Sequence, residues 1–342
     1  MHNEKILNCT CIETKDGNIF RTLVDFQDPN QAISYLKYYK DSSGTREKSN
    51  GKYSSFRNQK SGENFVMQNF PKNIIRHEQL DSYVMIPGNE IEKVYNPTDV
   101  LRTLMKEETL SKLHSKIFDL VNLIIENCNI PIEDIGISGS TLVGLESNSD
   151  DSDIDLLIYG RESSLKMIKN FNKLVGFGIE HYSEKNKGLL IPRRHPDTID
   201  GFNQSEALRN EFSKTSGQYL DTHFNISLIR KEEWRYPKIF SAPVNKKLGF
   251  CVVEAIILDD SEGFFVPPLY EIEIKRVITG NISALEVQYI IGSRFLHAQI
   301  GEVGKTVLVA GILQRRILNK KNIYVLSLEP WETVAGFIHM IE

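Results

Sequence analysis

Two aspartates constrain this chain most strongly. Asp153 and Asp155 stand two residues apart, directly before the apolar run 156–159. The apolar run predicts a buried strand, and residues two apart in a strand point to the same face of the sheet. We therefore expect both carboxylates on one face and Ile154 on the other. Because adjacent carboxylates repel each other, the pair predicts a cation between them, Mg²⁺ or Mn²⁺, whose other ligands come from phosphate and water.

A glycine and a serine precede these aspartates. Gly139 and Ser140 follow a short strand expected at 135–138. Backbone N–H groups and a hydroxyl at a strand end form a shallow phosphate site, and a helix starting at Thr141 would add partial positive charge there. We therefore predict that a nucleoside triphosphate binds at Gly139 and Ser140. Gly144 is expected to serve backbone packing.

The two aspartates and the phosphate site together predict nucleotidyl transfer. In a two-metal site, with ions roughly 3.5 to 4 Å apart, one ion activates the attacking hydroxyl and the other stabilises the leaving pyrophosphate. Asp153 and Asp155 are then catalytic residues that act as metal ligands. Asp150 and Asp151 lie just upstream and allow a shifted pair of Asp151 with Asp153. The stiff apolar strand directly behind Asp155 favours the pair at 153 and 155.

The arrangement of these residues resembles a known signature. Gly-Ser, a twelve-residue interval, then Asp-x-Asp before an apolar strand is similar to the DNA polymerase β-like nucleotidyltransferase superfamily. The whole chain is also similar to an archaeal group of nucleotidyltransferase-domain proteins, in which a segment like 136–160 lies between an N-terminal α/β region and a C-terminal β region with a counterpart of 258–262. The resemblance implies a mixed sheet with flanking helices, the Gly-Ser pair against nucleotide phosphates, and divalent metal on the two aspartates.

Active members of that superfamily commonly take a third carboxylate from a later strand. The candidate strand is 219–229, whose alternation places Asp221, His223, Asn225 and Ser227 on one face. We predict Asp221 as the third metal ligand and catalytic carboxylate, which would accept the proton of the acceptor hydroxyl. His223 has two interpretations, a group that orients Asp221 or a solvated side chain.

Basic residues indicate where an acceptor such as RNA could bind. Five of them stand in a stretch that also holds Tyr53 and Phe56, namely Arg46, Lys48, Lys52, Arg57 and Lys60. Basic residues interleaved with aromatic ones can follow phosphates and stack on bases, although a solvated polar loop has the same composition. Further along, Arg193 and Arg194, with Arg209, fit either a bidentate phosphate clamp or an ordinary exposed turn.

Two other patterns predict no chemistry. The four cysteines lack the second close pair that a zinc site needs, so we expect core or strand residues at Cys9, Cys11, Cys128 and Cys251. The segment 301–306 ends like a phosphate-binding P-loop, but Gln299 stands where the first glycine of that loop belongs. We expect a hairpin turn there.

Length and composition bound the class of protein. A chain of 342 residues with 40% hydrophobic and 25% charged residues predicts two or three folded domains of roughly 100 to 200 residues. No apolar run approaches the length of a membrane helix or of a signal peptide, so we expect a cytoplasmic protein without a membrane partner. The net charge of −4 gives no general attraction to nucleic acid, and RNA binding would need a local basic patch.

The expected fold class is α+β, in three regions. Residues 1–98 predict an N-terminal α+β domain, with Asp16-Gly17 as a hairpin turn. Residues 99–240 predict the mixed-sheet nucleotidyltransferase core, which begins with an amphipathic helix near 110–125. Residues 241–342 carry short strands at regular spacing and predict a small barrel, of which an oligonucleotide-binding type is one form.

The sequence thus predicts a metal-dependent nucleotidyltransferase that moves a nucleoside monophosphate from a triphosphate to a hydroxyl acceptor and releases pyrophosphate. Two alternatives stay open. One is a catalytically silent nucleotide- or RNA-binding protein on the same fold, and the other is a nucleotide-sensing regulatory or scaffold protein. The presence of both Asp153 and Asp155 favours the enzyme, because a silenced site would gain stability by losing one of two repelling charges.

Overall fold

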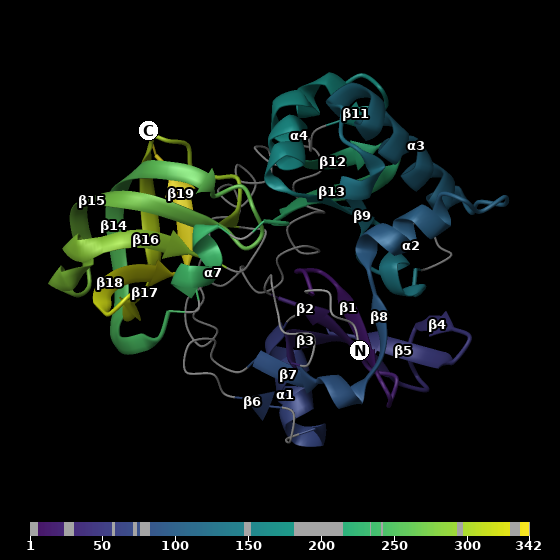
Figure 1. Cartoon of the computed structure of the whole chain (residues 1–342), viewed down its shortest axis with the longest axis horizontal. Helices are drawn as coiled ribbons and strands as arrows, with labels where there is room; N and C mark the ends of the chain where they lie inside the picture. Colours follow the sequence, from purple (N-terminus) through teal and green to yellow (C-terminus); the bar gives the residue numbers. More distant parts are fainter. Residues whose placement is uncertain are drawn as a thin grey trace. The chain divides into compact units, whose positions relative to one another are not determined.

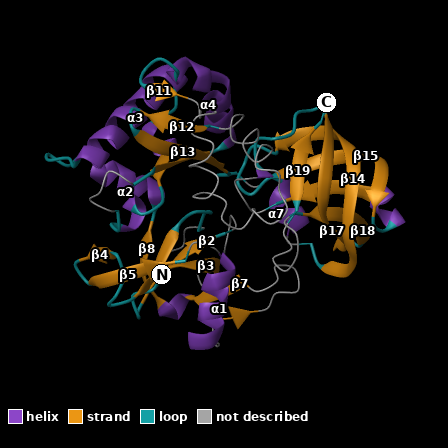
Figure 2. Ribbon diagram, turned by 180° about the vertical axis from the view of Figure 1, so that it is seen from behind, coloured by secondary structure: helices purple, strands orange, loops and turns teal. Residues whose placement is uncertain are grey.

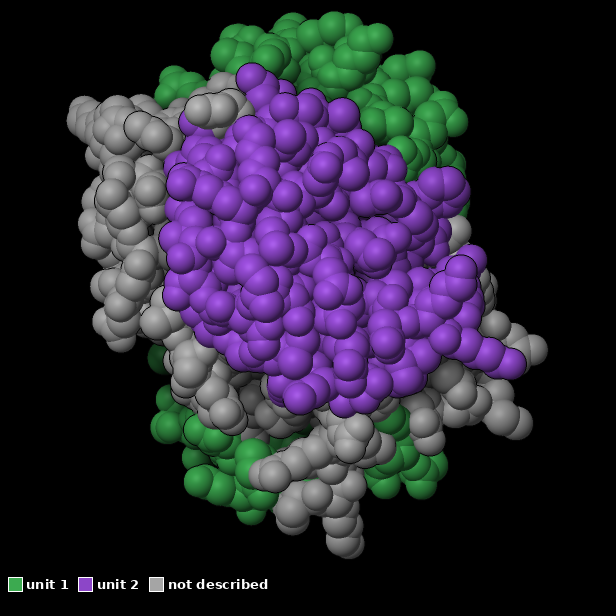
Figure 3. Space-filling model, turned by 90° about the vertical axis from the view of Figure 1, so that its left-hand side faces the viewer, with its two compact units in different colours: residues 1–75, 82–186, 215–232 green, residues 76–81, 187–214, 233–342 purple. Residues whose placement is uncertain are grey.

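The chain folds into two compact units (Figure 3). The first contains residues 1–75, 82–186 and 215–232, and the second contains residues 76–81, 187–214 and 233–342. The predicted regions 1–98 and 99–240 therefore fall largely within one unit. The computed structural model describes residues 6–23, 31–56, 59–70, 74–75, 83–146, 152–180, 215–232, 234–240, 242–292, 297–328 and 336–341. No helix in these ranges has the length and apolar character needed to cross a membrane.

An antiparallel sheet forms the first part of unit 1 (Figure 2). Its strands run in the order β4-β5-β3-β2-β1-β8, and β7 pairs with both β3 and β6. The strands are β1 Cys11–Thr14, β2 Ile19–Thr22, β3 Gln31–Lys40, β4 Arg46–Lys48, β5 Gly51–Ser55, β6 Ile74–Ile75, β7 Tyr83–Pro87 and β8 Ile91–Tyr95. Helix α1, Gln59–Asn69, contacts β3 and β7 and closes a core around Phe20, Leu36 and Val66. The stretch 46–60, for which a solvated polar loop was one interpretation, forms the β4–β5 hairpin and the start of α1 in its described part.

A mixed five-stranded sheet forms the second part of unit 1. Its order is β11-β12-β13-β10-β9, in which only the β10–β13 pair is parallel. The strands are β9 Ile135–Ile137, β10 Ile154–Tyr159, β11 Ile179–Glu180, β12 Ser216–Tyr219 and β13 Thr222–Ile229. The predicted amphipathic helix is α3, Lys112–Cys128, which buries Ile117, Leu120, Val121 and Ile124. Helix α4, Arg161–Leu174, packs on β10 and β13 and against α3, while α2, Pro97–Leu104, packs on β9.

The strands of unit 2 close into a barrel, in agreement with the expected barrel-like domain (Figure 1). Closure occurs because the long strand β14 pairs with β15 along one edge and with β17 along the other. The strands are β14 Val244–Glu262, β15 Leu269–Thr279, β16 Val287–Ile291, β17 Thr306–Leu318, β18 Lys321–Ser327 and β19 Phe337–Met340. Segment 301–306 leads into strand β17, whereas a P-loop leads into a helix. The fold as a whole is α+β, as predicted.

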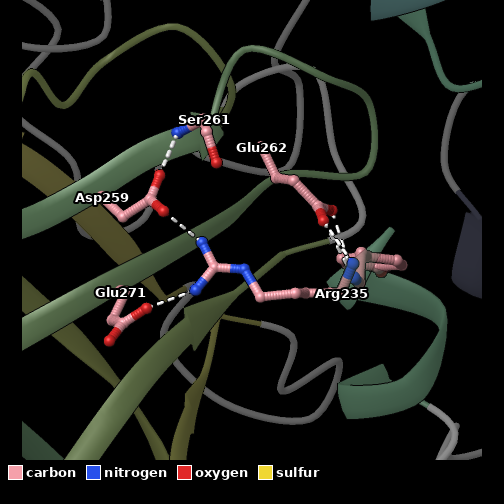
Figure 4. Close-up of polar contacts among 6 residues, drawn as sticks. Arg235, Asp259, Ser261, Glu262 and Glu271 are labelled. Carbon is pink, nitrogen blue, oxygen red and sulfur yellow. Dashed lines mark hydrogen bonds and ion pairs between the residues drawn. The ribbon is translucent and has the colours of Figure 1, made fainter. Parts of the chain in front are cut away.

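Carboxylates of β14 and β15 attach the short helix α7, Arg235–Phe240, to this barrel (Figure 4). Glu262, 1% exposed, accepts hydrogen bonds from the backbone N–H groups of Arg235 at 2.6 Å and Tyr236 at 3.2 Å. The Arg235 guanidinium pairs with Asp259 of β14 and Glu271 of β15. The first turn of α7 thus donates charge-assisted hydrogen bonds to carboxylates on two neighbouring strands.

We predict that Glu262→Ala destabilises unit 2 by about 1 to 3 kcal/mol, because two N–H donors at the start of α7 lose their acceptor. Urea unfolding followed by circular dichroism measures the change. The matched control is Glu273→Ala, which removes an exposed carboxylate from β15. Equal unfolding midpoints for the two variants would contradict this role of Glu262.

Candidate functional site

A row of polar residues crosses the second sheet at Asp155. Asp155 of β10 is in register with Asn225 of β13, which is in register with Ser216 of β12. On the other side, the N–H of Ser138 donates to the carbonyl of Asp155 at 2.8 Å. The neighbouring residue Phe224 packs its ring 6.2 Å from that of Phe171 in α4. Since side chains alternate along a strand, the helix covers one face and the polar row lies on the other.

Asp153 stands immediately before β10 and is exposed, whereas Asp155 is half-buried within the strand. Ile154, between them, is completely buried. This burial pattern is the one expected for two carboxylates on one face with an apolar residue on the opposite face. The structure thus places both predicted metal ligands at the start of β10, on the side away from α4.

The Asp155 carboxylate lies directly against the Gly139 turn. Gly139 has a positive φ of 64°, and a Cβ at this position would lie 2.4 Å from Oδ2 of Asp155. Ser140 follows in the right-handed helical conformation. Successive residues of opposite handedness turn their N–H groups toward one concavity, which favours anions. Among the described residues, no backbone hydrogen bond from a turn or loop uses the N–H of Gly139 or Ser140.

The helix considered at Thr141 is a single 3-10 turn, Thr141–Val143, that ends at Gly144. An element this short has almost no aligned peptide dipoles to sum. The expected positive charge from a helix N-terminus is therefore missing, and the N–H groups of Gly139 and Ser140 are what this turn offers to an anion.

Strand β3 of the first sheet brings positive charge toward Asp155. The charge of Tyr35 has the largest effect on the pKa of Lys37 and raises it, whereas burial lowers it. The charges of Tyr38 and Asp155 raise the pKa of Lys37 by smaller amounts. Burial raises the pKa of Tyr38, and the negative charge of Asp155 raises it further. The charge of Asp155, on β10, thus contributes to the pKa shifts of two side chains of β3.

Arg46 of β4 contacts the other end of the same turn. Its Nη1 donates to the carbonyl of Leu145 at 2.6 Å, and its guanidinium carbon lies 5.8 Å from the centroid of the Tyr38 ring. Lys37 and Arg46 thus place two cations near the Gly139–Asp155 contact. From its neighbours in the sequence, Arg46 was predicted to belong to a separate acceptor-binding stretch. Lys37 carries no comparable signal, because its strand is distinguished only by its aromatic residues.

Lys48 has an internal partner. Its Nζ donates to Oε2 of Glu13 and to the hydroxyl of Tyr95, both at 2.9 Å, and Asn50 donates to the other oxygen of Glu13 at 3.0 Å. Although burial alone would raise the pKa of Glu13, hydrogen bonds from Tyr95 and Lys48 lower it. Because its charge is paired inside the fold, Lys48 is neither a solvated side chain nor a residue available for contact with RNA. Of the other basic candidates, Arg57, Arg193, Arg194 and Arg209 lie outside the described residues, as does the side chain of Lys60.

A cavity of about 690 Å³ lies beside this cluster. Its wall is formed by β8, α2, the turn 141–144 and the start of α3. At that wall His114 lies 3.1 Å from Glu146 and 3.4 Å from Glu107. The turn that carries Gly139 and Ser140 therefore separates two features, the Asp155 carboxylate and this cavity.

Asp221 lies in the turn between β12 and β13 rather than within the polar row. Its exposed carboxylate pairs with Lys116 of α3 and lies 3.8 Å from Lys112, and the hydrogen bond from Lys116 lowers its pKa. Lys116 also donates to Thr222 at 2.7 Å. Among the residues that the structure describes, no three His, Cys, Asp or Glu side chains are grouped to hold a metal ion. The structure therefore does not bring Asp221 together with Asp153 and Asp155.

The chain is 27% identical over 291 residues to MJ1086, an uncharacterized protein of Methanocaldococcus jannaschii, and the match covers 78% of this chain and 82% of that protein. No family model matches the chain, and no solved structure matches it.

Lys48→Met should lower the free energy of unfolding of unit 1 by roughly 2 to 3 kcal/mol at neutral pH, because Glu13 keeps its buried charge but loses a charged donor. Lys52→Met, at an exposed position of β5, is the matched control. The lowered pKa of Glu13 contributes stability above its unfolded pKa, and this contribution is lost as pH falls through the folded value. The effect of Lys48→Met on urea unfolding should shrink over that acidic range, and a pH-independent effect would contradict the assignment.

Gly139→Ala and Gly144→Ala form a second matched pair. Both glycines have positive φ, 64° and 67°, so each alanine costs about 1 to 2 kcal/mol from backbone strain. A Cβ at Gly144 meets nothing within 4 Å, whereas one at Gly139 meets Asp155. We predict the larger loss of stability at Gly139 and its partial recovery in Gly139→Ala/Asp155→Ala. Equal losses at the two glycines would argue against the close approach of Asp155.

Proposed function

We propose that unit 1 binds a metal-bound nucleoside triphosphate at Gly139, Ser140, Asp153 and Asp155, and transfers its nucleotidyl group to a hydroxyl acceptor. The contact between Gly139 and the Asp155 carboxylate carries this proposal. At this contact, a turn whose backbone N–H groups are suited to binding phosphate lies beside a carboxylate that is suited to binding a cation. A metal-bound triphosphate needs both at once.

The residues near Asp155 fit a hard divalent cation. Asp153 and Asp155 would hold Mg²⁺ or Mn²⁺, which prefer oxygen ligands and retain water. In the same row, Asn225 Oδ1 and Ser138 Oγ are buried without a hydrogen-bond partner among the described residues. Such oxygens suit the water molecules of a hydrated ion. When bound, the metal would favour ionisation of the acceptor hydroxyl and offset charge on the leaving pyrophosphate.

The bond changes follow from the products. The acceptor oxygen forms a bond to the α-phosphorus, the bond to the pyrophosphate oxygen breaks, and the acceptor hydroxyl releases one proton. Lys37 and Arg46 supply positive charge near the turn, which supports binding of the highly charged triphosphate and pyrophosphate. RNA remains a candidate acceptor in this proposal.

A second candidate function is nucleotide binding without transfer. It is favoured by Asn225, a neutral amide in register with Asp155 on the neighbouring strand, and by the pairing of Asp221 with Lys116. With two carboxylates a single metal-bound nucleotide can be held, whereas activation of the acceptor commonly depends on a third. Both candidate functions include binding of a triphosphate, and only the first includes release of pyrophosphate.

Asp153→Asn and Asp155→Asn should each abolish Mg²⁺-dependent binding of a triphosphate in calorimetry, while the fold without metal is retained or slightly stabilised by the loss of repulsion. The matched control is Asp221→Asn, whose carboxylate pairs with Lys116. It should bind and turn over like the parent protein. Undiminished binding by both site variants would show that the assignment is wrong.

Turnover separates the two candidate functions. The parent protein is incubated with each labelled triphosphate, Mg²⁺ and total cellular RNA, and pyrophosphate and labelled RNA are measured. Transfer that is lost in Asp155→Asn supports the enzyme. Tight binding of a triphosphate without release of pyrophosphate from any of the triphosphates tested supports nucleotide binding without transfer.

A further inference from the structure

The barrel of unit 2 has a specific strand order. Along the sheet the order is β14-β15-β16-β18-β17, and β17 returns to β14. Numbered one to five along the chain, these strands follow the order 1-2-3-5-4-1. The third and fifth strands, β16 and β18, are parallel, and every other neighbouring pair in the ring is antiparallel. This is the arrangement of the five-stranded Greek-key barrels that bind oligonucleotides and oligosaccharides.

Positive charge is concentrated on one part of this barrel. Segments 242–253 and 311–328 contain no Asp or Glu, although the whole chain has a net charge of −4. They carry six basic residues, Lys246, Lys247, Arg315, Arg316, Lys320 and Lys321. The segments pair with each other through β14 and β17. Arg316 is buried and donates to the carbonyls of Ile239 and Phe240, so the remaining five form the surface that we call the basic strip.

The basic strip places like charges together at a cost in stability. Lys246 stands opposite Arg315 in the β14–β17 pairing, and like charges in register repel. Arg315 Nε is buried without a hydrogen-bond partner among the described residues. Lys320 adopts a positive φ of 65° in the two-residue turn between β17 and β18, where asparagine and glycine are preferred. A polyanion bound along the strip would offset these costs.

An exposed aromatic ring lies next to the strip. Phe250 of β14 is 37% exposed and is in register with Ile312 of β17. A positively charged groove with an accessible ring is the combination that binds single-stranded nucleic acid, because the cations follow the phosphates and the ring stacks on a base. The turn that holds Lys320 joins the fourth and fifth strands, one of the loops used by barrels of this order.

We propose that the basic strip and Phe250 bind a single-stranded polynucleotide, with its phosphates along Lys246, Lys247, Lys320 and Lys321. This surface belongs to unit 2 alone. It needs neither a metal ion nor a triphosphate, so it is independent of the function proposed for unit 1. If that function also holds, the strip is a binding site for a polynucleotide acceptor.

The test uses the full chain and fluorescein-labelled oligonucleotides of about 16 residues, oligouridylate and oligothymidylate, without metal or triphosphate. Fluorescence anisotropy is followed over about 50 to 200 mM salt. One variant removes four charges of the strip, by Lys246→Ala, Lys247→Ala, Lys320→Ala and Lys321→Ala. Its control removes four exposed lysines elsewhere, by Lys106→Ala, Lys169→Ala, Lys173→Ala and Lys305→Ala.

The strip variant should bind at least about tenfold more weakly and lose about 0.7 of salt slope for each phosphate contact removed. The control should change little, and Phe250→Ala should weaken binding without changing the slope. Lys320→Gly should weaken binding and yet raise the urea midpoint, because glycine suits the turn. Tighter binding of oligouridylate would identify RNA as the ligand, and tighter binding of oligothymidylate would identify DNA.

Three outcomes would overturn the proposal. The strip variant and its control could weaken binding equally, which would reflect net charge alone. A duplex of the same length could bind as tightly as the single strand. Heparin could bind while neither oligonucleotide does, which would leave a general polyanion surface.

Discussion

The close approach of the Asp155 carboxylate to the backbone at Gly139 determines the geometry of unit 1 around its polar row. It requires a residue without a side chain at 139, in a conformation that L-residues avoid, and a strand that holds Asp155 in register with β9. Both requirements are met by neighbouring strands of one sheet. The Gly139 turn and the Asp155 carboxylate are therefore positioned by the backbone pairing of the strands that carry them, which holds a site more precisely than a loop does.

The first sheet of unit 1 complements this contact with positive charge. Lys37 and Arg46 come from β3 and β4, strands far from β10 in the sequence. Lys48, the last residue of β4, pairs inward with Glu13 instead. Arg46 and Lys48 stand two positions apart in β4, where side chains share a face, and yet they have different partners. Arg46 donates to the Leu145 carbonyl, whereas Lys48 donates to the Glu13 carboxylate.

Local sequence patterns predicted much of the fold. The three- and four-residue recurrence of apolar side chains predicted α3. The Asp16-Gly17 turn and the regular strands after 241 could also be predicted, because both depend on residues that are neighbours in the sequence. The pairing of strands that are far apart in the sequence could not be predicted. The β14–β17 pairing that closes the barrel and the Lys116–Asp221 ion pair join residues whose proximity depends on topology. For the same reason the sequence did not predict that Lys37 lies near Asp155. Asp221 was assigned to the polar row because the alternation was extended to a residue before β13, which begins at Thr222.

The position of β13 within its sheet has a consequence for biosynthesis. This strand lies between β10 and β12, yet it follows β10 only after the long intervening segment 160–221. A nascent chain that ends before residue 222 exposes an edge of β10 whose backbone groups and apolar side chains have no partner strand. Folding of this sheet is therefore completed late, and the polar row at Asp155 forms only when Asn225 has left the ribosome. A shortened chain lacking β13 would present an aggregation-prone edge at the place where the full-length protein carries its candidate nucleotide site.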